Sequence, residues 1–412
     1  MKNKGMIIYI GLVLLFTNFM SYVGGGEGLS KLLLQVSRMV LLILIPIVLI
    51  YRNKYPKTTL FKGCMRLMCF FLFSMIGAIV IHNQSITDSF IVTSYAFVYL
   101  MFPIMYMLKL DEKSLIKLCF VLGFFWAAIM LIQQFTWPSY WFATRGETEE
   151  GEPEMRNGII RYGVAGTTFG LLMLFYAFQK YLEEGKRKYL VWIIIGLIGV
   201  YLTCTRQIMA ASAGCLLVGL WLKKKLRLGT LLGILLIGLV IYINADALFG
   251  EYVEMTETVD EDYIRFIALR YYALEYNKGN VLLFFLGNGE FRANSAYGRE
   301  MMIGNWEERG VYWSDVGWVG VYSAYGIITV LIILYIYYYI FKNRKYIDLY
   351  LLLFMLYSFV TSIMMNSFPC KLSAIGTILV LYLIDLSMVK NKKAEYLKRQ
   401  KAYEIQHNSA GI

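Results

Sequence analysis

The sequence predicts an all-α polytopic membrane protein with about twelve transmembrane helices, and three observations support this fold class. Hydrophobic residues make up 58% of the 412-residue chain, and the mean hydropathy is +0.56, which excludes an ordinary soluble domain. Apolar runs of about 20 residues, the length that crosses a hydrocarbon core of about 30 Å, recur along the whole chain. Lysine and arginine cluster in the short connections between these runs, as they do in cytoplasmic loops.

The apolar runs place the spans one by one. We predict spans at 6–23, 32–50, 64–82, 89–107, 116–135, 160–179, 189–204, 207–222, 228–248, 316–341, 346–366 and 372–389. Residues 188–222 are apolar except around Thr203–Arg206, and lysine-rich segments flank them at both ends. An even number of crossings is therefore needed, so two short helices should meet at an outer turn that carries Arg206.

The basic residues set the orientation, because short cytoplasmic loops collect Lys and Arg. Of the 40 basic residues, 27 (21 Lys and 6 Arg) fall on one side together with both termini and the basic tail 390–412. Both termini are therefore predicted to be cytoplasmic. The net charge of +12 then reflects anchoring at the inner membrane surface, and we expect no nucleic-acid partner.

Two extracytoplasmic loops, 136–158 and 249–315, are long enough to carry function within one integral membrane domain, 1–412. Thr258-x-x-Glu261 resembles a capping box and Gly279 a stop signal, so a short surface helix is predicted at 261–277. Its apolar residues at helical spacing should face apolar surroundings; they are Ile264, Ile267, Ala268, Tyr271 and Leu274. Gly287 and Gly289 permit a tight turn that points Glu290 or Arg292 inward.

The predicted outer side, including span ends near it, holds 10 Arg but only 3 Lys. Guanidinium grips two oxygens of a phosphate or carboxylate at once, whereas ammonium is a point charge. This bias favours an anion clamp, although such residues also pair with outer carboxylates or lipid phosphates. The candidate clamp residues are Arg156, Arg161, Arg206, Arg265, Arg270 and Arg292.

Two pairs of these arginines, Arg156/Arg161 and Arg265/Arg270, are five residues apart. On a helix that spacing turns the two side chains roughly 140° away from each other. Only one arginine of each pair is therefore needed at a common site.

The candidates for an outer general base are few. His82 is the one histidine on the predicted outer side, and the two carboxylate candidates are Asp315 and Glu290. Asp315 opens the tenth predicted span, where burial would raise its proton affinity; capping that helix is an equally good explanation. The six cysteines form no C-x-x-C motif or metal-ligand spacing, so no metal site is expected. We predict no other cofactor.

Four segments resemble the O-antigen polymerase and ligase superfamily. Leu202-Thr-Cys-Thr-Arg206-Gln is similar to its T-x-S-R turn, with Thr205 in place of Ser, and Arg156-Asn-Gly-Ile-Ile-Arg161-Tyr-Gly resembles its arginine-bearing segment before a span. Gly287-Asn-Gly289 resembles its G-x-G after the loop helix. The stretch from Asp315 to Gly326 resembles the segment where an acidic or histidine residue precedes a span. The resemblance covers roughly residues 155–340 and the layout of about twelve spans with one large outer loop.

The resemblance implies a metal-independent, inverting glycosyltransferase of a bacterial cytoplasmic membrane, with its active site outside. Its substrate would be an undecaprenyl-pyrophosphate-linked glycan. Arg161, Arg206 and either Arg265 or Arg270 would stabilise the leaving pyrophosphate, and Asp315, where ligases often have His, would receive the acceptor proton.

The absence of an outer-loop histidine favours a polymerase of capsule, exopolysaccharide or O-antigen repeat units over a ligase that passes finished glycan to another acceptor. A flippase or transporter of lipid-linked oligosaccharide is the third alternative. Membrane lipid, a chain-length regulator and a separate flippase are the expected partners.

Overall fold

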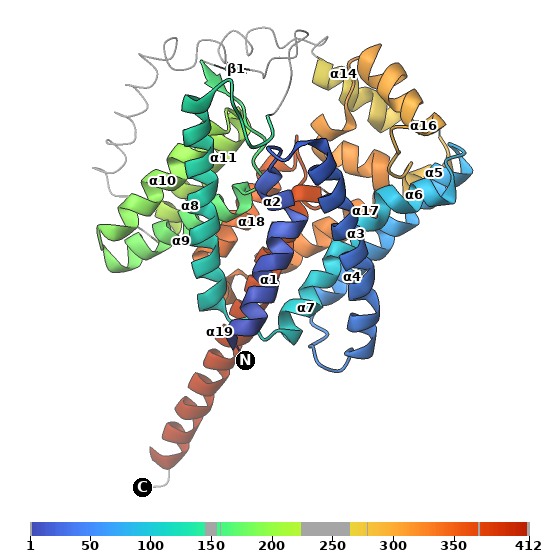
Figure 1. Ribbon diagram of the computed structural model, residues 1–412. Helices are drawn as coiled ribbons and strands as arrows, with labels where there is room; N and C mark the ends of the chain where they lie inside the picture. Colours follow the sequence, from blue (N-terminus) through green and yellow to red (C-terminus); the bar gives the residue numbers. More distant parts are fainter. Residues whose placement is uncertain are drawn as a thin grey trace.

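The computed structural model describes residues 2–144, 155–156, 158–223, 264–277, 279–369 and 371–409. Almost all of this part of the chain is helical, and the exceptions include one two-stranded hairpin (Figure 1). Both termini lie at the lower end of the bundle in Figure 1, whereas the hairpin and the helix α14 lie at the upper end. The predicted all-α class is therefore confirmed.

The elements have the following bounds. The α-helices are α1 (Lys2–Phe16), α2 (Asn18–Ser21), α3 (Gly26–Ile50), α4 (Thr59–Phe73), α5 (Met75–Val80), α6 (Ile86–Thr93), α7 (Met101–Met107), α8 (Glu112–Thr136), α9 (Thr167–Glu184), α10 (Lys188–Leu202), α11 (Arg206–Leu222), α14 (Ile264–Arg270), α15 (Val281–Leu286), α16 (Ala296–Arg299), α17 (Gly317–Lys342), α18 (Leu349–Thr361) and α19 (Lys371–Ser409). The 3-10 segments are η1 (Ser94–Leu100), η4 (Trp313–Asp315) and η5 (Arg344–Tyr346), and the π-helical segments are η2 (Tyr271–Glu275) and η3 (Glu300–Glu307). Strand β1 (Met155–Arg156) pairs antiparallel with β2 (Ile159–Ile160).

Six helical stretches of the described residues are long and apolar enough to cross a membrane. They are Gly28–Ile50, Thr59–Val80, Ile86–Met107, Glu112–Thr136, Gly317–Lys342 and Ser373–Gln400. Lys4–Phe16, Lys188–Leu202, Arg206–Leu222 and Leu349–Thr361 are shorter apolar helices. The chain therefore has the helices of a membrane-embedded protein.

One predicted span begins later than expected, and one lies outside the described residues. The span predicted at 160–179 is a helix only from Thr167, because residues 159–162 pair as extended chain with their neighbours and Gly166 precedes the first helical turn. The span predicted at 228–248 and the first part of the large loop, 249–263, are outside the described ranges.

Helix packing joins segments that are far apart in the sequence. Helices α8, α9 and α10 pack against one another, and α9 and α11 both contact α18. Helix α17 packs on α4 and α15, while α19 contacts α4, α7, α9 and η1 (Figure 1). Residues from Ala374 to Met388 of α19 are mostly buried in the main apolar core. This core holds the hairpin, the α10–α11 turn and the start of α17 in fixed positions.

The large loop is anchored by a second apolar cluster. Ala268, Tyr272 and Tyr276 are buried, and the Tyr272 hydroxyl donates to the Val311 carbonyl at 3.2 Å. A helix is thus confirmed over the described part of 261–277. Of the predicted apolar side, Ala268 is buried and Tyr271 packs against this cluster, whereas Ile264, Ile267 and Leu274 have exposed side chains. The segment η2 is π-helical, so it has more residues per turn than an α-helix. The buried residues Ala268, Tyr272 and Tyr276, each four residues apart, therefore lie on one side.

Two glycines allow α15 and α17 to cross closely. Gly287 (φ +78°) and Gly326 (φ +76°) both adopt left-handed backbone. A Cβ on Gly287 would lie 2.4 Å from the Ala324 carbonyl oxygen, and one on Gly326 would lie 2.1 Å from the Phe285 oxygen. The sharp turn predicted at Gly287 is confirmed, and it packs the end of α15 directly on α17.

Candidate functional site

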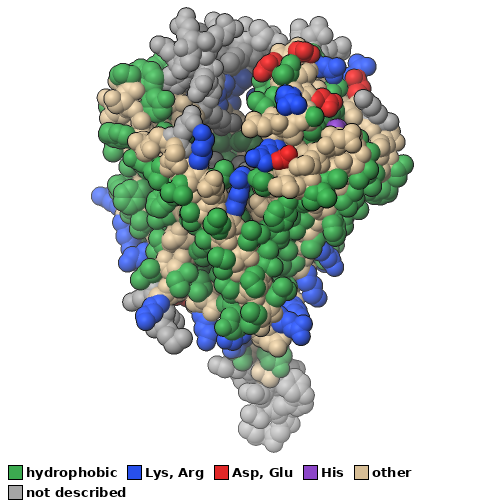
Figure 2. Space-filling model, turned by 45° about the vertical axis from the view of Figure 1, so that its right-hand side comes forward, with side chains coloured by type: hydrophobic (Ala, Val, Ile, Leu, Met, Phe, Trp, Pro, Cys, Tyr) green, Lys and Arg blue, Asp and Glu red, His purple; other side chains and the backbone are tan. Residues whose placement is uncertain are grey.

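A cavity of about 640 Å³ brings together residues from five separate segments of the chain. Five of its lining residues were predicted from the sequence as site residues: Arg156, Arg161, Arg206, Arg265 and Asp315. The upper end of the molecule is hollowed in Figure 2, and basic side chains lie within the hollow. The described lining residues contain four guanidinium groups and one carboxylate, a formal charge of +3. The site therefore has the composition of an anion-binding cavity.

The β1–β2 hairpin supplies two of these arginines. Gly158 (φ +71°) makes its turn, and Arg156 pairs with Ile159 across it. Gln134 of α8 fixes the second strand, because its side chain donates to the Ile160 carbonyl at 2.9 Å and accepts from the Ile160 amide at 3.0 Å. Arg161 follows directly and is only 7% exposed. Both arginines line the cavity because they stand on a hairpin, so the helical spacing argument does not apply to this pair.

The connection between α10 and α11 supplies the third arginine. Cys204 takes a left-handed φ of +47°, which turns the chain between the two helices, and Arg206 is the first residue of α11. The predicted pair of short helices that meet around Arg206 is thus present. Thr205 precedes the helix without a side-chain cap, so the amides of the first turn add positive potential at the cavity.

A hydrogen bond beside the cavity connects the start of α11 to the end of α18. The Gln207 side chain donates to the Thr361 carbonyl oxygen at 2.7 Å, at the end of α18. The Gly317 amide donates to the Met364 carbonyl at 3.1 Å. These two bonds tie α11, the residues after α18 and the start of α17 together, which fixes Arg206 relative to Asp315.

The two arginines of α14 separate as predicted for a helix. Arg265 lines the cavity, whereas Arg270 lines a different cavity of about 530 Å³ and pairs with Glu275 at 3.4 Å. The sequence left open which of the two faces the other arginines, and the helix geometry selects Arg265.

Asp315 lines the cavity, but neither predicted explanation of its position holds. The side chain is exposed, so the expected burial at the start of the span is absent. The helix α17 begins at Gly317 with Val316 as its N-cap, so Asp315 does not cap it. Asp315 instead closes the 3-10 turn η4 and accepts from the Ser314 hydroxyl at 3.3 Å. Its carboxylate therefore faces the arginine cavity without a structural role in α17.

Glu290 and Arg292 were also predicted as site residues, and the structure places both of them elsewhere. The Tyr325 hydroxyl donates to the Glu290 carboxylate, and Arg292 forms an ion pair with Asp88 of α6. The turn at Gly287 does point inward as predicted, but it points toward α17 and α6. These two residues therefore hold the large loop on the helices.

His82 is also placed away from the cavity. Its Nε2 atom is hydrogen-bonded to Asn288 Oδ1 at 2.8 Å, and its ring stacks on Tyr297 with 3.9 Å between centroids. Among the described lining residues of the arginine cavity, Asp315 is the one carboxylate, the group that the sequence offered as a general base.

Sequence reasoning missed six residues that line the cavity: Thr205, Gln207, Tyr312, Ser314, Met364 and Met365. Four of them are within three residues of Arg206 or Asp315, so proximity in sequence was an available signal. Met364 and Met365 carried no signal, because only the contact between α18 and α17 brings them to the site.

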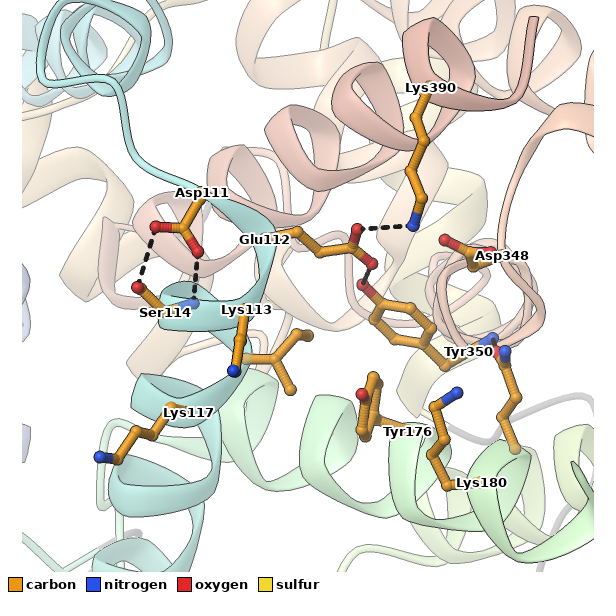
Figure 3. A pocket seen from close by; sticks show the side chains of 12 residues that line it. Asp111, Glu112, Lys113, Ser114, Lys117, Tyr176, Lys180, Asp348, Tyr350 and Lys390 are labelled. Atoms are coloured by element: carbon orange, nitrogen blue, oxygen red, sulfur yellow. Dashed lines mark hydrogen bonds and ion pairs between the residues drawn. The ribbon is translucent and has the colours of Figure 1, made fainter. Parts of the chain in front are cut away.

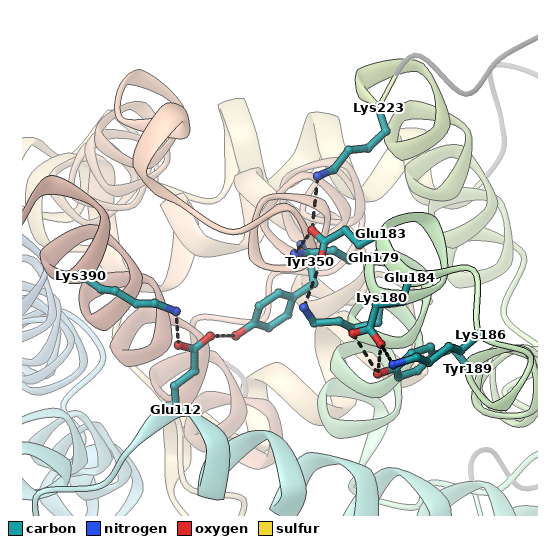
Figure 4. A network of polar contacts seen from close by, with 10 residues as sticks. All are labelled: Glu112, Gln179, Lys180, Glu183, Glu184, Lys186, Tyr189, Lys223, Tyr350 and Lys390. Carbon is teal, nitrogen blue, oxygen red and sulfur yellow. Dashed lines mark hydrogen bonds and ion pairs between the residues drawn. The ribbon is translucent and has the colours of Figure 1, made fainter. Parts of the chain in front are cut away.

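A larger cavity, of about 800 Å³, lies at the lower end of the bundle and has a different character. Several of its charged side chains are bonded within the bundle: Glu112 binds Lys390 and Tyr350, as Figure 3 shows, and Asp111 caps α8. Figure 4 extends this network to Glu183, which binds Lys180 at 2.9 Å and Lys223 at 3.4 Å. These contacts join the ends of α8, α9 and α11 to the start of α18 and the middle of α19, so we interpret the network as structural.

The pKa of Glu183 is perturbed in this network. Burial by itself raises this pKa, but hydrogen bonds from Lys180 and Gln179 outweigh burial and leave the pKa below its usual value. The carboxylate therefore stays ionised in the folded protein at lower pH than in an unfolded chain.

No protein-family model matches the chain, and no curated protein matches it either. Within the described ranges, no group of three or more His, Cys, Asp and Glu side chains is placed to hold a metal ion. The arrangement of the arginine cavity is therefore the main evidence on function.

Proposed function

We propose that this chain is a membrane glycosyltransferase that polymerises undecaprenyl-pyrophosphate-linked oligosaccharide repeat units into capsule, exopolysaccharide or O-antigen. The observation that carries the proposal is the convergence of Arg156, Arg161, Arg206 and Arg265 with Asp315 on one cavity. Planar guanidinium groups from three segments can engage a diphosphate from several directions, whereas a single exposed arginine cannot. The protein is taken to span a bacterial cytoplasmic membrane about twelve times, with cytoplasmic termini and the arginine cavity outside.

The reaction that fits these groups is an inverting displacement. The acceptor hydroxyl oxygen forms a bond to the anomeric carbon, and the bond between that carbon and the pyrophosphate oxygen breaks. Asp315 takes the hydroxyl proton, and the pyrophosphate leaves on its lipid carrier. The arginines stabilise the negative charge that develops on the leaving group, which is electrostatic catalysis by groups already in place.

The charges within the apolar helices support a transferase more than a transporter. Transport pathways place ionisable groups near the membrane midplane, where they line the route of the substrate. Asp385 of α19 is buried, and its carboxylate accepts a hydrogen bond from Tyr106 of α7. This hydrogen bond joins two helices, which supports a structural role for Asp385.

The proposal is tested with purified protein in lipid nanodiscs and the lipid-linked glycan that accumulates when the gene is deleted. A polymerase converts single repeat units into a ladder of longer lipid-linked glycans without any other acceptor. A ligase would leave the repeat units unchanged until a second acceptor is added. Movement of the unreacted glycan across a vesicle membrane would indicate a flippase and contradict the proposal.

A further inference from the structure

Another cavity, of about 360 Å³, lies directly beside the arginine cavity, and we call it the second cavity. Met365 lines both cavities, and Tyr162 in the second follows Arg161 in the first. In the same way, Thr203 and Ile208 of the second cavity flank residues 205–207 of the first. The remaining walls come from α8, α9, α18 and α19. The two cavities therefore share part of their lining.

The lining of the second cavity differs sharply from that of the first. None of its described lining residues is charged. Aromatic rings, among them Trp126, Phe169 and Phe354, form part of the wall, and seven Ser or Thr side chains and Asn366 form another part. Such a wall suits an uncharged group that has both an apolar face and several hydrogen-bonding groups.

Two deeply buried donors in this wall have no partner among the described residues. The Asn366 side chain is 7% exposed and that of Trp126 is fully buried, and neither Asn366 Nδ2 nor Trp126 Nε1 makes a hydrogen bond. The Phe368 amide donates to Asn366 Oδ1 at 3.0 Å, which holds the amide group so that Nδ2 points the other way. A buried donor without a partner costs roughly 1–3 kcal/mol, and a ligand that accepts hydrogen bonds removes this cost.

We propose that the second cavity binds the sugar ring that is attached to the pyrophosphate. The inference rests on the proposed function, because the sugar ring can occupy the second cavity only if the arginine cavity holds the pyrophosphate. A sugar ring offers an apolar face for the aromatic wall and oxygen atoms for the two unpartnered donors. The isoprenoid part of the carrier has no acceptor atoms, so it would leave both donors unsatisfied.

The packing of Trp126 makes it a precise probe of this assignment. A Cβ placed on Gly166, Gly170 or Gly199 would lie within 2.8 Å of the indole ring. The glycines therefore leave room for the ring and hold it in one position. Trp126→Phe removes the unpartnered N–H group and keeps an aromatic ring in the same place.

The experiment measures binding to two probes by the full-length protein in nanodiscs. One probe is the lipid-linked repeat unit from cells that lack the gene, and the other is undecaprenyl pyrophosphate without sugar. We expect the wild type to bind the glycosylated probe about tenfold more tightly, the gain from one or two net hydrogen bonds. Ser373→Leu, which places a larger apolar side chain in the cavity wall, should bring the two affinities to within about twofold.

Gly214→Leu is the matched control, because Gly214 of α11 has open space around its Cβ position. This variant should keep the tenfold preference, and both variants are compared by thermal unfolding in the same nanodiscs. If Ser373→Leu weakens both probes equally, the carrier lipid occupies the cavity and the inference is overturned. If the wild type binds neither probe, the proposed function itself fails, which is a different result.

Trp126→Phe gives an independent test that does not depend on filling the cavity. It should lower the unfolding temperature somewhat, because the buried indole packs against three glycines and the smaller ring leaves a cavity there; the sugar-free probe controls for this loss. It should weaken the glycosylated probe about fivefold to tenfold and leave the sugar-free probe unaffected. Equal affinity of this variant and the wild type for the glycosylated probe would overturn the inference.

Discussion

Arg206→Lys is the substitution that tests the arginine cavity most directly. It keeps the positive charge, and Lys and Arg have nearly equal helix propensity at the start of α11. The bond from Gln207 to the Thr361 carbonyl at 2.7 Å fixes this helix end, so the backbone cannot shift to bring an ammonium group closer. The substitution therefore removes planar, two-point contact and leaves the charge in place.

The expected loss follows from the contacts that lysine cannot make. One charge-assisted hydrogen bond contributes about 1.5–3 kcal/mol, which corresponds to a decrease in kcat/KM of roughly 10- to 100-fold. The assay follows the chain-length distribution and the initial rate with lipid-linked repeat units in nanodiscs. Arg206→Ala should lose at least as much, because it removes the charge as well.

The matched control is Arg187→Lys, at the opposite end of α10 from Arg206, where the side chain is exposed and lines none of the cavities described above. It should retain wild-type activity. If Arg206→Lys stays within about twofold of the wild type while Arg206→Ala is inactive, charge alone suffices and two-point clamping is refuted. If both variants are fully active, Arg206 is not part of the site.

Three further predictions concern the base, the fold and pH. Asp315→Asn should abolish turnover but still bind the lipid-linked glycan, as measured by nanodisc binding; normal activity would remove Asp315 as the base. Gly287→Ala should lower the unfolding temperature far more than Gly279→Ala, because both positions have positive φ but only Gly287 has backbone atoms within 2.4 Å. Thermal stability should fall as the pH drops below about 4.3, where Glu183 is protonated in the unfolded chain, and Glu183→Gln should flatten that fall; an unchanged slope would contradict it.

The sign of the pH effect follows from the direction of the pKa shift. The pKa of Glu183 is lower in the folded protein than in an unfolded chain. A carboxylate of this kind stabilises the fold at pH values above its unfolded pKa. The stabilisation is lost as the pH falls through the folded value, so acid and not alkali should weaken the network of Figure 4.

Local patterns predicted the elements well where one segment decides its own structure. Apolar length gave the approximate positions of most of the long helices that the structure describes, and the turn at Gly287 followed from the conformational freedom of glycine. The short helices around Arg206 followed from the polar break in an apolar stretch. The segment before α9 was predicted less well, because a hairpin that pairs with α8 side chains replaced the expected first helical turns.

The sequence by itself determined that the chain is a helical membrane protein with arginine gathered in a few polar segments. Hydrophobic length and charge bias are properties of single segments, so they can be read without knowing the fold. Only the tertiary structure decided that Arg156, Arg161, Arg206 and Arg265 meet Asp315, and that Glu290, Arg292 and Arg270 do not. Convergence depends on how α8, α11, α14, α17 and α18 pack against one another, and that packing is set by contacts between residues far apart in the chain.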